Sequence, residues 1–380
     1  MTRRIVLTGD LLRPADELFR PAQTGNILWL HRLLRRPIAA ASGLEVEALA
    51  WAPPPGAGAT DFDTPGFYAD TGVAPDIGGW VTLFDADALP AAAVARFARA
   101  VDGAVAVIGF ELAEVQKRLL SQFGIPWIDL NIHPIRFGPD VFFAVQTNHP
   151  EVAAALVPHH AEDHVFEPWA DLLAATAVKA PLSHPVEEGV LVVGQTRIDR
   201  ALVADGRLLD LSDFAEGFHR AVGPEGRILF KPHPYNNDGF GLHGIGLPLR
   251  RILQLDDNAY LLMAQDAVRR VVGVSSSLVA EARFFGKDGV FLGASPFRIA
   301  PRRDAVAPLL HASVTEAWLW ADFWRDLLAP LTDVGARDGR RPTLGPNALR
   351  TSLRQFWGWD EIAFQLPFDL TRQRANRRGG

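Results

Sequence analysis

Short apolar runs that alternate with helix-like segments are the feature of this sequence that most constrains its fold. The runs occur in both halves of the chain, and segments with apolar residues at helical spacing separate them. Runs of this kind are typical of strands buried on both faces of a parallel sheet. We therefore expect an α/β fold. The expected strands are 4–8, 46–51, 104–108, 125–128, 190–193, 227–230, 270–274 and 289–292.

The chain divides into two such halves. A stretch with prolines and glutamates, 178–189, interrupts the alternation, which restarts at Val190. A chain of 380 residues is long enough for two domains of ordinary size. We expect two doubly wound domains, with C-terminal helices over 312–331 and 347–357 that pack back across both. The predicted boundaries are 1–180 for the first domain, 190–345 for the second, and 346–380 for a C-terminal helix and basic tail.

Capping and turn chemistry give three local expectations. Thr24 or Asn26 is expected near the N-cap of a helix that begins around Ile27. Asp87 is expected to cap a helix that starts at Ala88. Asp85 and Asp87 also match an Asp-x-Asp metal-binding pattern, but we favour the capping interpretation and expect no metal. The segment 53–72, rich in proline, glycine and aspartate, is expected to be a long surface loop.

Composition excludes several classes of function. The chain has no cysteine, which excludes disulfides and thiolate chemistry. Its formal net charge of -6 argues against a nucleic-acid-binding surface spread over the whole protein. The first apolar run is too short for a signal peptide, and no stretch approaches the roughly 20 apolar residues of a membrane span. We therefore expect a cytoplasmic protein. The four arginines of Arg372–Arg378 either contact anionic lipid weakly, at the inner face of the cytoplasmic membrane, or form a solvated tail.

Polar side chains follow two expected strands of the second half. In open α/β sheets, ligands bind at the carboxyl edge, where such side chains lie. A cation beside an imidazole suits a phosphate or a leaving group. The carboxylate among them, Asp199, has a second interpretation as a helix cap. The residues are Gln195, Arg197 and Asp199 after 190–193, and Lys231 and His233 after 227–230.

Two further segments present polar groups at strand ends. In the first half, His133 and Arg136 follow the strand 125–128, although a single histidine in such a place is as often structural as functional. In the second half, Ser275–Ser277 follow the strand 270–274 and precede a helix. Serines there cap the helix, and the exposed N–H groups, hydroxyls and helix dipole also favour a phosphate. Glu281, one turn on, either accepts bonds from a ribose diol or is solvated.

Three motifs, taken together, resemble the capsule-polysaccharide-synthesis family of retaining β-Kdo glycosyltransferases. They are Gln195-Thr-x-x-Asp199, Lys231-Pro-His233-Pro234 and Ser275-Ser-Ser-x-x-x-Glu281-Ala. The segments Gly124-Ile-Pro and Ile132-His-Pro-Ile-Arg-Phe137 are similar to that family as well, so the resemblance covers roughly residues 110 to 292. One residue departs from it. The family has a serine two residues after the aspartate, where this chain has Ala201.

The resemblance implies a GT-B-like pair of Rossmann-type domains that face a cleft, with CMP-β-Kdo as donor and no metal or other cofactor. It implies a nucleotide-sugar donor and a saccharide or glycolipid acceptor as partners. It also implies transfer with retention, which two successive inversions achieve when a carboxylate is the nucleophile. The family's acid and histidine fall on Asp199 and His233, the implied catalytic pair. The implied donor-binding residues are Gln195, Arg197, Lys231, Ser275, Ser276, Ser277, Glu281, Arg136 and His133.

Two other functions fit the same residues. The first is a GT-B transferase that uses CMP-sialic acid or a UDP-sugar as donor. The second is a non-catalytic GT-B-like subunit of a polysaccharide assembly, which would bind donor or partner without turnover. Release of CMP or UDP from a set of donors distinguishes the three functions.

Overall fold

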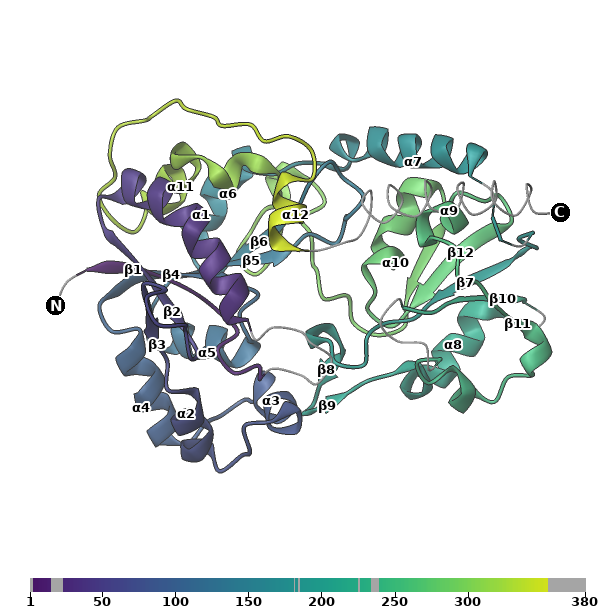
Figure 1. The fold of residues 1–380 in the computed structure, drawn as a ribbon, viewed down its shortest axis with the longest axis horizontal. Helices are drawn as coiled ribbons and strands as arrows, with labels where there is room; N and C mark the ends of the chain where they lie inside the picture. Colours follow the sequence, from purple (N-terminus) through teal and green to yellow (C-terminus); the bar gives the residue numbers. More distant parts are fainter. Residues whose placement is uncertain are drawn as a thin grey trace, which may run out of the picture.

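A computed structural model describes residues 3–14, 23–180, 182–183, 185–224, 226–233 and 239–354. The described chain forms two α/β domains that lie side by side, each built around a largely or wholly parallel sheet with helices on both faces (Figure 1). This confirms the expected α/β class, and the pairing of two Rossmann-type domains is GT-B-like. No helix of the described residues is both long and apolar enough to cross a bilayer.

The first domain contains a seven-stranded sheet in the order β14-β6-β5-β4-β1-β2-β3. Alternate residues of β1 point to opposite faces, so Ile5 and Leu7 join one hydrophobic cluster and Val6 joins the other. The central residues 5–7 are all apolar for this reason. The strands are β1 (Arg4–Gly9), β2 (Glu45–Ala50), β3 (Ala59–Asp61), β4 (Ala104–Phe110), β5 (Trp127–Ile132), β6 (Phe143–Thr147) and β14 (Ala312–Val314), of which β6 and β14 are antiparallel to their neighbours.

Helices cover both faces of this sheet. One cluster contains residues of α1 (Thr24–Ser42), α6 (Pro150–Leu156) and α11 (Ala321–Leu328). The opposite cluster contains residues of α2 (Thr64–Thr71), α3 (Ile77–Phe84), α4 (Ala91–Ala100) and α5 (Glu114–Gln122).

The second domain contains a five-stranded parallel sheet in the order β11-β10-β7-β12-β13. Its central strand repeats the pattern of β1, because Leu191 and Val193 join one cluster and Val192 joins the other. The strands are β7 (Gly189–Val193), β10 (Ile228–Lys231), β11 (Ile252–Gln254), β12 (Val268–Gly273) and β13 (Asp288–Phe291), with a separate hairpin of β8 (Val203–Ala204) and β9 (Arg207–Leu208). The helices are α7 (Glu167–Lys179), α8 (Ala215–Val222), α9 (Ala259–Met263) and α10 (Ser277–Glu281).

The structure corrects the predicted end of the second domain at residue 345. Strand β14 lies inside the expected tryptophan-rich helix 312–331 and pairs with β6 of the first sheet. Helix α11, which follows it, packs against α1 (Figure 1). The chain therefore returns to the first domain before residue 312. The predicted tail, Arg372–Arg378, lies outside the described residues.

Two of the three local expectations are wrong. The expected loop 53–72 contains β3 and α2, because Asp63 caps α2 through Gly66 N (2.9 Å). Thr24 lies near the N-cap as expected, because it is the first residue of α1 and follows the N-cap Gln23, and its hydroxyl donates to Trp51 O. Asp87 is exposed and pairs with Arg118, whereas α4 begins at Ala91 after Pro90.

A loop of the first domain joins the two domains. Between β5 and β6, the side chains of Ile135, Phe137 and Phe142 enter the core of the second domain. The short helix α12 (Ala348–Leu353) holds this loop, because the fully buried Arg350 donates to the carbonyl oxygens of Arg136 (2.9 Å) and Gly138 (3.0 Å). The interface on this side is therefore a packed core rather than an open hinge.

Candidate active site

Three neighbouring strands of the second sheet bring the predicted segments together. Strand β7 lies between β10 and β12, and all three run parallel, so their carboxyl ends meet at one edge. The strand order also reverses at β7, because β10 and β11 extend the sheet on one side and β12 and β13 on the other. Such a reversal is the place where open α/β sheets bind ligands. The segments that meet there are Gly194–Asp199, Lys231–His233 and Ser275–Ser277.

Direct contacts join these segments. Gln195 accepts a hydrogen bond from Ser275 N (2.8 Å), and its Nε2 donates to Ser275 Oγ (3.0 Å). Both residues are buried. Gly194 allows a close approach on the other side, since a Cβ there would lie 3.1 Å from the backbone nitrogen of His233. The predicted donor-binding residues Gln195 and Ser275 therefore form part of the framework of the site.

The polar groups around this edge differ in what they contact. Asp199 is the cap of a 3₁₀ turn, and its Oδ1 accepts a hydrogen bond from Ala201 N (3.0 Å). The second carboxylate oxygen, Oδ2, takes no part in this cap. Lys231 donates to Asp256 O (3.3 Å). Ser276 occupies the N-cap position of α10, although its hydroxyl makes no capping bond there. Arg197 is exposed on the loop after β7.

The structure corrects the assignment of His133 to the donor site. Its side chain is only 2% exposed and stacks on Phe166. Nδ1 accepts from Ile135 N (3.0 Å), so the proton lies on Nε2, which is 2.8 Å from Ser313 Oγ. Burial lowers the pKa of His133 to about 3. With both ring nitrogens engaged inside the protein, His133 is a structural residue.

Glu281 is neither solvated nor directed at a ligand. The side chain is fully buried, and its Oε1 accepts from the backbone nitrogen of Arg136 in the first domain (2.6 Å). Tyr260 Oη donates to the same carboxyl group (3.2 Å). Burial raises the pKa of Glu281 to about 7, against the opposing effect of Arg136. Glu281 therefore links the two domains, and its partner Arg136 belongs to that link.

Sequence reasoning missed a polar cluster at the carboxyl edge of the first sheet. This sheet also reverses its order, between β1 and β4, and Asp10 and Glu111 directly follow these two strands. Glu111 has a φ of 53°, a conformation that is strained for glutamate and concentrated at functional sites. The strand-end rule that selected Asp199 would have selected both residues. On β5, the fully buried Asp129 pairs with Lys117 (2.9 Å) and accepts from Asn131 Nδ2 (3.0 Å).

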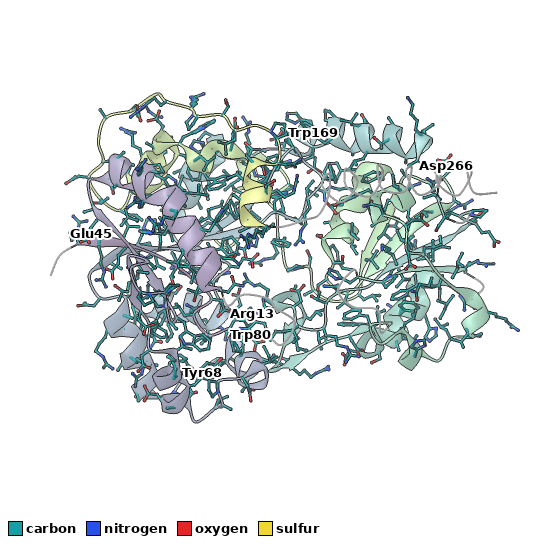
Figure 2. The ribbon with its side chains drawn as sticks, in the orientation of Figure 1. Arg13, Glu45, Tyr68, Trp80, Trp169 and Asp266 are labelled. Carbon is teal, nitrogen blue, oxygen red and sulfur yellow. The ribbon has the colours of Figure 1, made fainter. Side chains whose placement is uncertain are left out.

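Charges within the cluster compensate one another to different degrees. Burial alone would raise the pKa of Asp129, but Lys117 and Arg200 hold it below its usual value. Asp10 has weaker compensation, and burial raises its pKa although Leu12 N and Trp80 Nε1 both donate to its carboxylate. Figure 2 shows Trp80 and Arg13 together on the side of the first domain that faces the second.

We expect the substitution Trp80→Phe to destabilise the protein by about 2 kcal/mol, because it leaves a buried carboxylate oxygen without its donor. Trp80 Nε1 lies 2.8 Å from Asp10 Oδ2, and both residues are buried. The aromatic packing against Phe84 is largely kept. Chemical denaturation measures the change, and an unfolding midpoint equal to that of the wild type would contradict the expectation.

Comparisons with known proteins add little to this geometry. No protein-family model matches the sequence, and no curated protein is similar to it. Among solved structures, the chain is similar to Thermosulfurimonas dismutans KpsC, beta Kdo 2,7 transferase, at 12% identity over 64% of this chain and 81% of that chain, with a TM-score of 0.35. It is also similar to Thermosulfurimonas dismutans KpsC, beta Kdo 2,4 transferase, at 17% identity over 49% of this chain and 68% of that chain, with a TM-score of 0.31. A likeness at this level fixes neither the activity nor the donor of this chain.

Proposed function

We propose that this protein is a retaining glycosyltransferase that moves β-Kdo from CMP-Kdo to a saccharide or lipid-linked acceptor, with Asp199 as nucleophile. One observation carries the proposal: Gly194–Asp199, Lys231–His233 and Ser275–Ser277, which belong to the three motifs that resemble the β-Kdo transferase family, lie at one edge of the second sheet, where its strand order reverses. Asp199 lies on the side of this edge that meets the first domain, because the neighbouring Arg200 donates to Asn131 and Leu112 of that domain.

The residue types at this edge suit the donor. The phosphate of CMP needs compensation of its charge as it leaves, and Lys231, His233 and the serines at the start of α10 supply cations and donors. The anomeric carbon of Kdo bears a carboxylate, which an arginine recognises with two parallel hydrogen bonds. We assign this role to Arg197, because it is exposed on the loop that carries Asp199, whereas Arg136 lies beside Glu281.

The transfer then takes two displacements. In the first, a carboxylate oxygen of Asp199 forms a bond to the anomeric carbon, the bond from that carbon to the phosphate oxygen breaks, and CMP leaves with the electron pair. In the second, the acceptor hydroxyl attacks the same carbon, its proton passes to a base, and the bond to Asp199 breaks. Two inversions give net retention. His233 is the group that we assign to stabilise the leaving phosphate.

A donor screen tests the proposal. Purified protein is incubated with CMP-Kdo, CMP-sialic acid or UDP-sugars, with an acceptor mixture, and release of CMP or UDP is measured. We expect release from CMP-Kdo and little from the others. Release from CMP-sialic acid alone, or from a UDP-sugar alone, would contradict CMP-Kdo as the donor. The protein would still be a glycosyltransferase, with the other nucleotide sugar as its donor. Donor binding without any release would contradict a transferase and indicate a binding subunit.

A further inference from the structure

Both domains hold the loop that carries Asp199. At its start, Gln195 is bonded to Ser275 of the second domain (2.8 and 3.0 Å). Three residues later, the carbonyl oxygen of Ile198 accepts a hydrogen bond from Arg13 of the first domain (3.2 Å). The side chain of Ile198 packs against the core of the first domain. The β8–β9 hairpin that follows lies against α3 of the first domain (Figure 1). The loop therefore spans the interface.

Arg200 makes further links to the first domain. Its guanidinium donates to Asn131 Oδ1 (3.1 Å) and to Leu112 O (2.9 Å), both in the first domain. It also lies over the ring of Phe84, 5.6 Å from the centroid, and its side chain is only 19% exposed. A planar fork held by two acceptors and an aromatic face has little freedom of orientation.

The charge of Arg200 matches its surroundings. Burial alone would lower its pKa, but nearby carboxylates of the first domain raise it above the usual value. These are the carboxylates of Glu111, Asp129, Glu114 and Asp10. The guanidinium therefore stays charged in this polar cluster, and removing it would leave buried carboxylates with less compensation.

Arg200 is coupled to Asp199 through the backbone. The two residues are consecutive, so their Cα atoms are about 3.8 Å apart. Asp199 caps the turn that Arg200 begins: Oδ1 accepts from Ala201 N (3.0 Å), and the backbone oxygen accepts from Leu202 N (3.0 Å). A displacement of Arg200 from its acceptors therefore changes the direction of the Asp199 carboxylate.

We propose that Arg200 is a positioning residue, through which the first domain fixes the orientation of Asp199 at the edge of the second sheet. The inference rests on the proposed function. Arg200 does not contact substrate in this role, because its guanidinium is already engaged by Asn131, Leu112 and Phe84. The nucleophile of one domain is aligned only when the other domain is docked against it.

The variants Arg200→Met and Arg200→Lys test this role, with Arg207→Met as the matched control. Arg207 lies on the β8–β9 hairpin that follows the turn of Arg200, is mostly exposed and pairs with Asp213. We expect kcat to fall about 100-fold in Arg200→Met, since a misplacement of about 1 Å can cost that much, while the KM for the donor changes little. Arg200→Lys keeps the positive charge but lacks the planar guanidinium group, so we expect kcat to fall less than in Arg200→Met. The control keeps the wild-type kcat.

A second measurement does not depend on activity. Hydrogen exchange of the Ala201 amide reports whether the Asp199 cap persists, and we expect it to be at least about 10-fold faster in Arg200→Met. Wild-type exchange in both Arg200 variants, or wild-type kcat in Arg200→Met, would overturn the positioning role. Absence of turnover in the wild-type protein with every donor would instead overturn the proposed function, so the two failures are distinguishable.

Discussion

Replacing Asp199 with asparagine is expected to lower turnover by about 1,000-fold or more while leaving the fold unchanged. Loss of a nucleophile typically has an effect at least this large. The structure makes asparagine the informative substitution, because Asp199 also caps a turn through Ala201 N. Asparagine caps as well as aspartate does. The variant therefore removes the nucleophilic oxygen and keeps the capping oxygen.

Two further variants separate chemistry from structure. Asp199→Ala loses the cap as well, so we expect the same loss of turnover together with a decrease of about 1 kcal/mol in the free energy of unfolding. Asp205→Asn, on the exposed turn of the neighbouring hairpin, is the matched control and should retain activity. Nucleotide release measures turnover, and denaturation measures stability.

Peptide mapping addresses the covalent step directly. After incubation of the wild-type protein with CMP-Kdo and no acceptor, we expect the peptide that contains Asp199 to gain the mass of one Kdo residue. The Asp199→Asn protein should show no such gain. Full turnover in Asp199→Asn, combined with an unmodified peptide in the wild type, would exclude Asp199 as nucleophile.

The parts of the fold that the sequence predicts are those that local pattern determines. Strands such as 190–193 are buried on both faces, so they are continuous apolar runs that stand out from the helical segments beside them. These strands also determine where the carboxyl edges of the two sheets lie. The sequence therefore predicts that Gln195, Lys231 and Ser275 lie close together at one edge. Strand β14 has only three residues, and its pairing with β6 depends on a contact more than 160 residues away in sequence. No local pattern marks such a strand.

The site was harder to predict for the same reason. His133 and Glu281 carry groups that suit a ligand, and only the three-dimensional structure places them in the interface between the domains. Arg200 is one of two arginines close to Asp199 in the sequence, and its position beside Asn131 depends on how the two domains dock. The first-sheet residues Asp10 and Glu111 could have been found, since both follow apolar strands in the way that Asp199 does.

Replacing Glu281 with glutamine is expected to stabilise the protein near pH 8 by about 3 kcal/mol and to have little effect near pH 4. The ordinary pKa of this carboxyl group is 4.5, and burial raises it to about 7 in the folded state. The folded state therefore holds the proton more tightly than the unfolded state does. The contribution of Glu281 to stability is greatest below pH 4.5, falls as the pH rises to about 7 and is constant above that. The shift in its pKa corresponds to about 3 kcal/mol of free energy of unfolding.

Glutamine is suited to this test because it resembles the protonated acid. Its oxygen can still accept from Arg136 N, and its amide can donate to Tyr260 Oη, so both contacts of Glu281 are kept. Glu216→Gln, on the exposed face of α8, is the matched control. It should not change the dependence of stability on pH.

The difference between variant and wild type is the quantity to measure, because the wild-type curve combines opposing contributions. Burial lowers the pKa of His133 to about 3 and that of His311 to about 4, so stability from these residues is lost as the pH falls below 6.5. This loss partly cancels the gain from Glu281 over the same range. Denaturation of both proteins from pH 4 to pH 8 should give a difference that grows with pH and levels off near 7. A difference that is constant over this range would show that the pKa of Glu281 is the same in the folded and unfolded states, and would contradict the expectation.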